Sequence, residues 1–345
     1  MIKSIIDSKT IDRLAQMLRG VKNVVVTCHL SPDGDAMGSS MGLCRLLRNM
    51  GKNATVITPD QYPRSLQFME GTRDVVVYSR SMAHARLLMS RAELVFCLDF
   101  NVLQRIDQLG RELGRVRVPK VLIDHHLDPD STFDLRISFP EASSTCELVF
   151  RTVMQLGLLR YMDRTVAENL YTGLMTDTGN FTYSCNDPEI FEIVAMLMQK
   201  DIDRAALYKQ AMNTFSADCL RLQGFALSQK MEVVPQKRAA IIALTAAELQ
   251  QFNYVKGDTE GLVNKPLAIP GVCWSVLLRE DADKVKVSMR SEGDFAVNTL
   301  CHDSFGGGGH KNAAGGETKD GLDKALQTVY GILDSLPDAD GESEP

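Results

Sequence analysis

Short apolar runs that alternate with helical stretches are the feature that most constrains the fold of this chain. Four runs in the first half are rich in β-branched residues and are bounded by turn residues: VVVTC (24–28), ATVIT (54–58), LVFCL (94–98) and KVLI (120–123). Strands that are apolar on both faces are typical of parallel sheets covered by helices on either side. The first half therefore predicts a doubly wound, mostly parallel α/β sheet.

The second half predicts a helical connector followed by a smaller α/β domain. Residues 187–230 show a helical pattern without a clear strand, and strand-like runs return at 239–244, 271–280 and 284–290. Helical stretches near 245–253, 295–302 and 320–335 lie between or after these runs. The predicted boundaries are 1–186 for the first domain, 187–230 for the connector and 231–336 for the second domain. The acidic tail, 337–345, has no large apolar side chain and is predicted to be disordered.

Acidic residues and histidines follow three of the four predicted strands directly. His29, Asp33 and Asp35 come after the first run, Asp99 after the third, and Asp124, His125 and His126 after the fourth. The carboxyl ends of parallel strands share one edge of a sheet, where ligands bind, and Asp177 could reach this edge from a neighbouring helix. A lone DxD is usually a turn, and Asp99 alone could cap a helix. Their joint occurrence at strand ends predicts a functional site.

So many carboxylates in a small space predict bound cations. Their mutual repulsion would otherwise force them to take up protons or move apart. Two divalent cations about 3.5–4 Å apart, bridged by one carboxylate, relieve this repulsion and form the usual two-metal hydrolase site. Mixed imidazole and carboxylate ligands favour Mn²⁺ or another first-row ion over Ca²⁺. We therefore expect two divalent cations, Mn²⁺ first, with Mg²⁺ or Co²⁺ as alternatives.

A different signal appears in the second domain. In 284–290 the polar residues Lys284, Lys286, Ser288 and Arg290 alternate with apolar ones, so a strand would carry its cations on one face. The run GGGGH (306–310) allows a ligand close to the backbone and offers amides to phosphate. It is not a P-loop, because the GK[ST] ending is absent. A glycine run alone is more often a flexible loop, but the residues after it favour a substrate-binding element.

Composition narrows the partners and the compartment. The net charge of −6 argues against a protein that grips long duplex DNA, but not against a small phosphorylated ligand. No apolar run reaches 18 residues, so no membrane-spanning helix is expected. The eight cysteines are scattered and the amino terminus does not resemble a signal peptide. These features predict a cytoplasmic protein without a disulfide framework.

At these residues the sequence resembles the DHH phosphoesterase family with its DHH-associated carboxyl-terminal domain. The matching motifs follow the family's order: HLSPDGDAMGSS (29–40), LDFN (98–101), DHH (124–126), TDTGNF (176–181) and GGGGHKNAAGG (306–316). The chain is most similar to the small stand-alone branch of the nanoRNase and pAp-phosphatase type. The resemblance implies an active site in the cleft between the two domains, which close over the substrate.

The resemblance also implies roles for individual residues. His29 and Asp33 would hold the first metal, Asp35, His125 and Asp177 the second, and Asp99 would bridge both. Asp124 would orient a histidine, and His126 would stabilise the substrate phosphate or protonate the leaving oxygen. The implied substrate-binding residues of the second domain are Arg290, Ser291, Gly307, Gly308, Gly309 and His310.

The implied activity is a two-metal phosphoesterase in which a metal-bridging hydroxide attacks phosphorus. Its substrates would be short oligonucleotides (nanoRNA, in the 3′–5′ direction), the 3′-phosphate of pAp, or both. Its partners are accordingly short single strands or nucleotide bisphosphates, and a homodimer is one option. Alternatives are a phosphodiesterase for linear or cyclic dinucleotides such as pApA and c-di-AMP, a pyrophosphatase or polyphosphatase, and a metal-binding regulatory protein without turnover.

Overall fold

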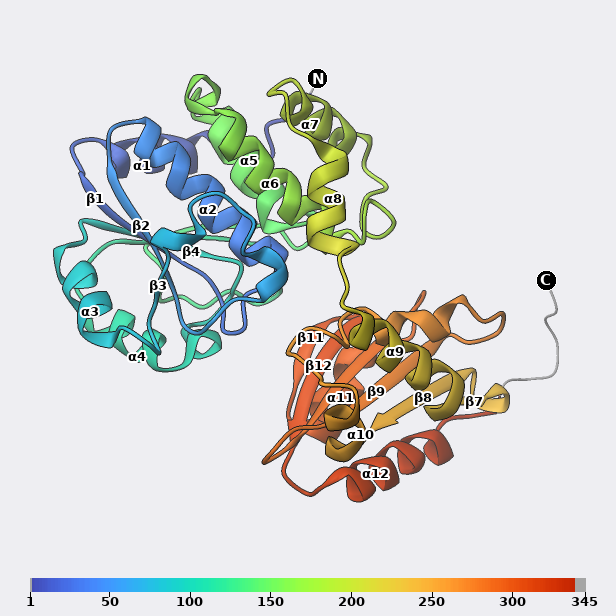
Figure 1. Cartoon of the computed structure of the whole chain (residues 1–345). Coiled ribbons are helices and arrows are strands. Elements are labelled where there is room, and N and C mark those ends of the chain that lie inside the picture. Colours follow the sequence, from blue (N-terminus) through green and yellow to red (C-terminus); the bar gives the residue numbers. More distant parts are fainter. Residues whose placement is uncertain (1, 339–345) are drawn as a thin grey trace. The chain divides into compact units, whose positions relative to one another are not determined.

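The computed structural model describes residues 2–338 and divides the chain into two compact units, Met1–Thr214 and Phe215–Pro345 (Figure 1). The boundary falls inside the segment 187–230, which is predicted to be a connector. The helices before the boundary pack on the core of the first unit, and the helix after it packs on the second. The tail predicted to be disordered lies outside the described residues, apart from positions 337 and 338.

The first unit is built on a six-stranded parallel sheet. Its strand order is β3 (Val76–Val77), β2 (Asn53–Thr58), β1 (Asn23–Thr27), β4 (Leu94–Leu98), β5 (Lys120–Asp124) and β6 (Leu135–Ser138). The chain order reverses direction between β1 and β4, which is the switch point where doubly wound folds bind ligands. The predicted fold class is confirmed. The short outer strands β3 and β6 were not predicted, because they are too short to show a pattern.

Helices cover both faces of this sheet (Figure 1). One face packs against α1 (Ser8–Leu18), α2 (Gly34–Asn49), α5 (Thr145–Gln155) and α6 (Arg164–Asp177), with α7 (Pro188–Met198) and α8 (Arg204–Met212) extending the same core. The other face packs against α3 (Met82–Arg91) and α4 (Asp107–Arg115). The buried strands β4 and β5 have no exposed residue, as their continuous apolar runs predict.

Glycines bring α2 and α6 unusually close. A Cβ on Gly38 would lie 2.6 Å from the carbonyl oxygen of Asn169 on α6, and one on Gly173 would lie 3.1 Å from the Cα of Asp35 on α2. Any side chain at either position would push the helices apart. The close packing holds the first turn of α2, with Asp35, next to the last turn of α6, with Asp177.

The second unit is built on a mixed six-stranded sheet. Its strand order is β11 (Gly308–His310), β12 (Ala313–Thr318), β10 (Val285–Ser291), β9 (Trp274–Glu280), β8 (Ala239–Leu244) and β7 (Met231–Val234). Only β8 and β9 pair in parallel. One face packs against α11 (Val297–Phe305) and α12 (Leu322–Ser335). The other packs against α9 (Ala217–Phe225), α10 (Ala246–Gln251) and the 3-10 segment Leu262–Ala268.

The glycine run of this unit is structured rather than a flexible loop. Gly306 ends α11 with a φ of 59°, in the left-handed region that glycine adopts without strain. Gly308 and Gly309 then enter β11, and a Cβ on Gly309 would lie 2.3 Å from the carbonyl oxygen of Ala313. The sequence pattern missed β11 and β12, because glycine and alanine carry no strand signal.

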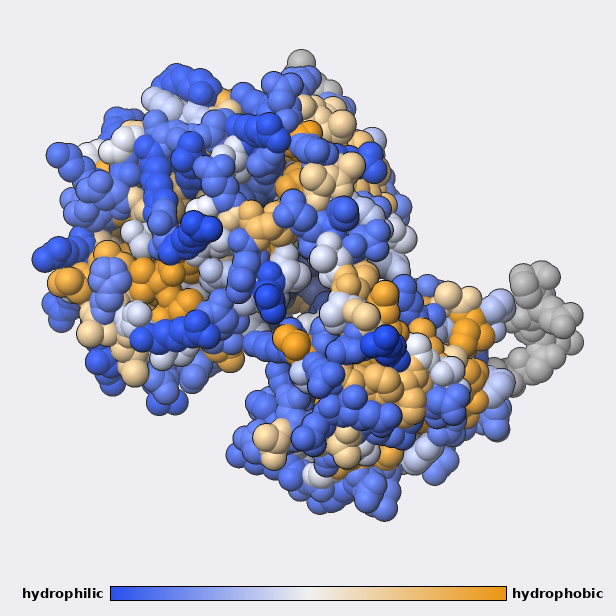
Figure 2. Space-filling view, viewed as in Figure 1, coloured by the Kyte–Doolittle hydropathy of each residue, from blue (hydrophilic) through white to orange (hydrophobic). Residues whose placement is uncertain are grey.

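The faces of the two units that Figure 2 shows are largely hydrophilic, with smaller groups of apolar side chains between the polar ones. None of the helices within residues 2–338 has the length and apolar character needed to cross a bilayer. The cysteines are free thiols, and Cys28 and Cys97 are fully buried in the first unit. They pack as small core residues, as the apolar runs around them predict.

Candidate metal centre

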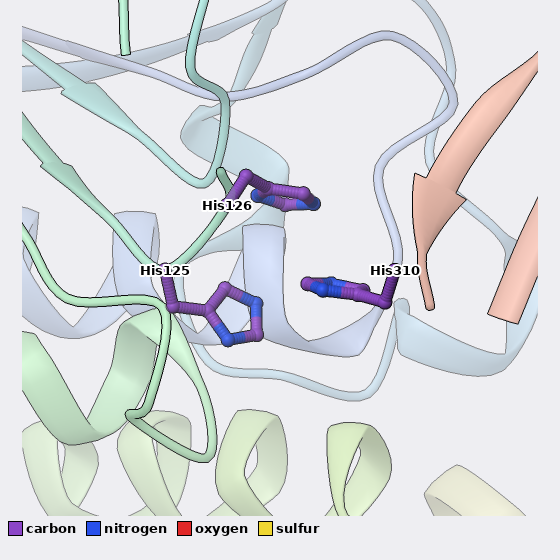
Figure 3. A group of neighbouring side chains, drawn as sticks. All are labelled: His125, His126 and His310. Atoms are coloured by element: carbon purple, nitrogen blue, oxygen red, sulfur yellow. The ribbon is translucent and has the colours of Figure 1, made fainter. Parts of the chain in front are cut away.

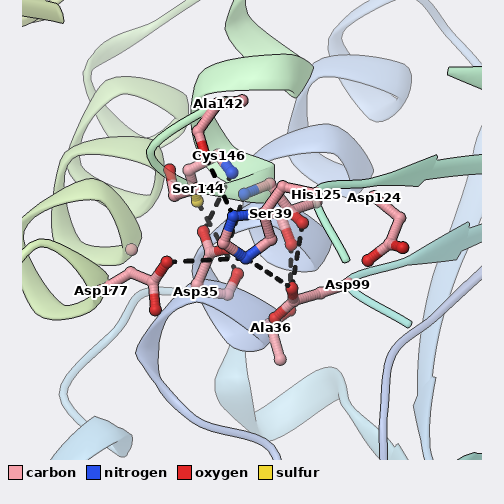
Figure 4. Close-up of polar contacts among 12 residues, drawn as sticks. Asp35, Ala36, Ser39, Asp99, Asp124, His125, Ala142, Ser144, Cys146 and Asp177 are labelled. Carbon is pink, nitrogen blue, oxygen red and sulfur yellow. Dashed lines mark hydrogen bonds and ion pairs between the residues drawn. The ribbon is translucent and has the colours of Figure 1, made fainter. Parts of the chain in front are cut away.

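Strand ends and helix ends of the first unit deliver the predicted ligands to one place, and Figure 4 shows Asp35, Asp99, His125 and Asp177 there. His29 follows β1, Asp99 follows β4, and His125 follows β5. Asp35 lies in the first turn of α2, and Asp177 ends α6. The helix of Asp35 begins where it does because one oxygen of Asp33, Oδ1, accepts hydrogen bonds from the backbone N–H groups of Asp35 and Ala36. The other oxygen of Asp33 is left to face His29.

Two groups of possible ligands share Asp99. In the first, Nε2 of His29 lies 3.6 Å from Oδ2 of Asp33 and 3.4 Å from Oδ2 of Asp99. In the second, Nε2 of His125 lies 3.6 Å from Oδ2 of Asp177 and 4.0 Å from Oδ2 of Asp35. The other oxygen of Asp99, Oδ1, lies 3.6 Å from the same nitrogen of His125. Asp99 therefore presents one oxygen to each group.

The histidines are held in one tautomer by hydrogen bonds at Nδ1. Nδ1 of His29 lies 2.8 Å from the carbonyl oxygen of Leu30, and Nδ1 of His125 lies 3.2 Å from that of Ala142. A carbonyl oxygen can only accept, so each Nδ1 carries a proton and donates it. This leaves Nε2 of each ring as the atom that faces the carboxylates and that could bind a cation in place of its proton. Such an arrangement is typical of histidines that bind metals.

A third close group, formed by Asp99, Asp124 and His126, differs in one respect. Nδ1 of His126 lies 2.7 Å from Oδ1 of Asp124, which is a normal hydrogen bond. His126 is thus oriented by a fully buried carboxylate, and its other nitrogen is turned away from Asp124. Its ring lies edge to face with that of His125, with centroids 5.0 Å apart (Figure 3). This geometry favours an oriented acid or base over a metal ligand.

The raised pKa values of the buried groups show that negative charge accumulates in this site. Burial, together with Asp99 and Asp177, raises the pKa of Asp35 well above its ordinary value. Burial also raises the pKa of Asp177 to about 7. Burial lowers the pKa of His125, but Asp177, Asp99 and Asp35 outweigh it and raise that pKa to about 9. The site therefore takes up positive charge readily, and divalent cations would supply that charge without protons.

The spacing of the ligand atoms fits metal ions better than direct ion pairs. Separations of 3.4–4.0 Å between nitrogen and oxygen are too long for hydrogen bonds. Ligand atoms that each lie 2.0–2.2 Å from a common ion are separated from one another by roughly 3–4 Å. In each group all ligand atoms lie within 4.8 Å of one another. The residues present therefore fit two divalent cations.

The start of α5 also contributes to the site, although this was not predicted from the sequence. The backbone N–H groups of Thr145 and Cys146 donate to the two oxygens of Asp35, at 2.6 and 2.9 Å. The hydroxyl of Thr145, which is fully buried, donates to Oδ1 of Asp99 at 3.0 Å. One turn of helix therefore holds both carboxylates, and its N-terminal dipole favours their negative charge. The only local signal is Ser144, whose side chain caps the helix.

Asp60 was also missed, although it too follows a strand. Its carboxylate accepts a hydrogen bond from the backbone N–H of Ser31 at 2.6 Å. Ser31 has a φ of 53°, an unfavourable region for a residue with a side chain. Asp60 thus stabilises the loop that carries His29 and Asp33.

The predicted substrate residues of the second unit form an ordered row. Arg290 on β10 and His310 on β11 both pair with Ala313 on β12, so the two side chains point to the same face of the sheet. The next row on that face contains Gly308 and Gly315. A Cβ on Gly308 would meet nothing within 4 Å, so the backbone of Gly308 is uncovered on the face that carries the two polar side chains.

Ser291 and Gly307 lie differently from the other predicted substrate residues. Ser291 points to the opposite face and is 7% exposed, and its hydroxyl donates to the carbonyl oxygen of Phe295. A Cβ on Gly307 would lie 2.1 Å from the carbonyl oxygen of Gly315. These contacts tie both residues to the packing of the sheet, and their role in substrate binding stays a prediction.

A parallel sheet that carries two such ligand groups at its carboxyl edge is typical of metal-dependent phosphoesterases. Comparison with known proteins agrees with this class. The model of the DHH family N-terminal domain matches residues 23–174, and that of the DHHA1 domain matches residues 239–335. The chain belongs to the DHH family of metal-dependent phosphoesterases.

Relatives of known name cover nearly the whole chain. The bifunctional oligoribonuclease and PAP phosphatase NrnA of Thermus thermophilus is 30% identical over 318 residues, which are 92% of this chain and 91% of that protein. The probable bifunctional oligoribonuclease and PAP phosphatase NrnA of Streptococcus mutans is 28% identical, over 86% and 90% of the two chains. The crystal structure of an exopolyphosphatase-related protein from Bacteroides fragilis is 41% identical, with a TM-score of 0.93 over 96% and 98% of the chains.

Proposed function

We propose that this enzyme hydrolyses short oligoribonucleotides and the 3′-phosphate of pAp, with two divalent cations at the carboxyl edge of its first sheet. The observation that carries the proposal is the shared carboxylate of Asp99, which faces both ligand groups at 3.4 and 3.6 Å. The names of the relatives from Thermus thermophilus and Streptococcus mutans support the substrate class.

In this proposal His29, Asp33 and Asp99 hold one cation, and Asp35, Asp99, His125 and Asp177 hold the other. Mn²⁺ suits these mixed imidazole and carboxylate ligands. When bound, two cations would lower the pKa of a shared water molecule and offset the charge of the phosphate. Asp124 keeps His126 oriented, so that Nε2 of His126 can stabilise the phosphate or give a proton to the leaving oxygen.

A panel of substrates tests the proposal directly. Phosphate or nucleotide release is measured with Mn²⁺ and with a chelator, on pAp, a short oligoribonucleotide, c-di-AMP and pyrophosphate at equal concentration. We expect Mn²⁺-dependent turnover that is fastest on pAp or the oligoribonucleotide. Faster turnover of pyrophosphate or of c-di-AMP would overturn the proposed substrate class and leave the metal centre in place.

Thr145→Val is expected to weaken metal binding without unfolding the protein. Valine keeps the volume of the buried side chain and the backbone N–H that donates to Asp35, but it removes the hydroxyl that holds Asp99. Loss of a hydrogen bond to a ligand typically costs 10–100-fold in metal affinity or activity. Titration calorimetry with Mn²⁺ measures the change. Thr152→Val is the matched control, because its buried hydroxyl only donates to Leu148 within the same helix.

Arg290→Ala is expected to impair substrates with a second phosphate selectively. Arg290 lies in the second unit, whereas the proposed metal ligands all lie in the first. Its planar guanidinium can donate two parallel hydrogen bonds to phosphate oxygens. Binding energy from a remote phosphate can orient the scissile one. We expect kcat/KM for pAp to fall at least about tenfold, or about 1.4 kcal/mol.

A minimal ester supplies the control for this variant. Turnover of bis-p-nitrophenyl phosphate and the Mn²⁺ content should stay close to those of the unmodified enzyme, because this ester has no second phosphate. Equal losses on pAp and on the minimal ester would instead place Arg290 among the residues that act on the reacting phosphate.

A further inference from the structure

The face of the second sheet that carries Arg290 continues to a second cationic position. Side chains two residues apart on a strand share a face, so Arg290, Ser288 and Lys286 follow one another along β10. Lys286 pairs in register with Arg279 on β9 and with Glu317 on β12. Between the rows of Arg290 and Lys286 lie Ser288 and the bare backbone of Gly315.

The cations around Lys286 have partners of their own, whereas none of the described residues pairs with Lys286. The ammonium of Lys284 pairs with Glu317 at 2.7 Å. The guanidinium of Arg279 pairs with Asp281 at 3.2 Å and donates to Thr259 at 3.0 Å. Among residues 2–338, Lys286 forms no hydrogen bond or ion pair. A half-buried ammonium is thus left with its charge unmatched.

The charges near Lys286 favour an anion at this place. Burial lowers the pKa of Lys286, and the positive charge of Arg279 lowers it further; the carboxylate of Asp281, which pairs with Arg279, raises it in part, while Lys256 and Lys284 lower it. An ammonium held among other cations and partly removed from water is stabilised by any anion that reaches it.

The distance between Lys286 and Arg290 along the strand indicates which kind of anion this face could bind. Lys286 lies four residues from Arg290 on one face of β10, so their backbone positions are about 13 Å apart. Phosphates placed directly over these two backbone positions lie farther apart than the two phosphates of one nucleoside bisphosphate. They could belong to one extended single strand, with an intervening phosphate beside Ser288. Grooves for single strands follow the backbone with cations in this manner.

We propose that Lys286 binds a phosphate of the oligonucleotide beyond the nucleotide held by Arg290, so that this face selects substrates longer than a dinucleotide. The inference rests on the proposed function and deepens it. The face of β10 then works as a track with two cationic positions, of which pAp uses only the first. Longer oligonucleotides gain affinity from the second.

The test compares Lys286→Gln with the unmodified enzyme on substrates of increasing length. We expect kcat/KM for a pentaribonucleotide to fall about fivefold or more, and kcat/KM for pAp and for a dinucleotide to change less than about twofold. Binding of a fluorescent pentaribonucleotide, measured by anisotropy in EDTA, should weaken in parallel. Its dependence on salt should lose about 0.7 in log–log slope, as for one phosphate contact on a single strand.

Two further variants serve as controls for the charge and for the position of Lys286. Lys286→Arg keeps the cation and should retain most of the preference for the longer substrate. Lys324→Gln removes an exposed lysine from α12, which packs on the opposite face of the sheet, and should change nothing. Circular dichroism shows whether each variant is folded.

The outcomes separate the inference from the proposed function. An equal effect of Lys286→Gln at all lengths, including none, overturns the inference and leaves the proposed function standing. An unmodified enzyme that cleaves neither pAp nor oligoribonucleotides overturns the proposed function, and the inference with it.

Discussion

Asp99→Ala is expected to remove almost all phosphoesterase activity and to weaken the binding of both cations. The carboxylate lies between His29 and His125, and its two oxygens face both sets of ligands. Changes in residues that only support a metal ligand typically cost 10–100-fold, so loss of a ligand common to two cations should cost more than about 100-fold. Activity assays and metal analysis of the purified variant measure the two effects.

Asp12→Ala is a matched control, because this aspartate lies exposed on α1. It should retain full activity and two cations per chain. If Asp99→Ala turned over substrate normally at ordinary Mn²⁺ concentrations, Asp99 could not bridge the two cations. Loss of a single cation would assign Asp99 to one group alone.

The second large effect is expected for His126→Ala, with the opposite result for metal binding. Nδ1 of His126 is engaged by Asp124 at 2.7 Å, and we propose that Nε2 serves the phosphate or the leaving oxygen. Loss of a general acid typically lowers the rate roughly 10²–10⁴-fold. Both cations should remain bound, because neither proposed ligand set includes His126. Single-turnover rates and metal analysis together distinguish the two roles.

His84→Ala provides the control for this variant, since His84 is an exposed residue of α3. It should leave rate and metal content unchanged. A His126→Ala protein that bound only one cation would show that His126 is a ligand. In that case the group of Asp99, Asp124 and His126 would replace one of the two proposed ligand sets.

Much of the first unit is predictable because its signals are local. Each central strand is a short apolar run, and each is followed by its acids or histidines. Since parallel strands place their carboxyl ends at one edge, the convergence of His29, Asp99 and His125 follows from the strand pattern alone. The structure confirms the sheet. Both His29 and His125 lie within 4 Å of Asp99.

The second unit was harder to predict from its pattern. The alternation in 284–290 correctly indicated a strand with a cationic face. The strands β11 and β12 escaped notice, because their glycines and alanines lack the β-branched side chains that mark a strand. As a result, the pairing of Arg290 and His310 with Ala313 could not be foreseen.

By itself the sequence determined the residue types, the strands and the edge at which the ligands meet, because these depend on near neighbours along the chain. The tertiary structure alone decided how the ligands are held. Asp35 receives two N–H groups from a helix that begins 110 residues later, and Asp99 receives the hydroxyl of Thr145. The contact of α2 with α6 depends on Gly38 and Gly173, which no local pattern relates. Such contacts form only when the packed helices exclude water, since then each buried carboxylate must find a donor in another part of the chain.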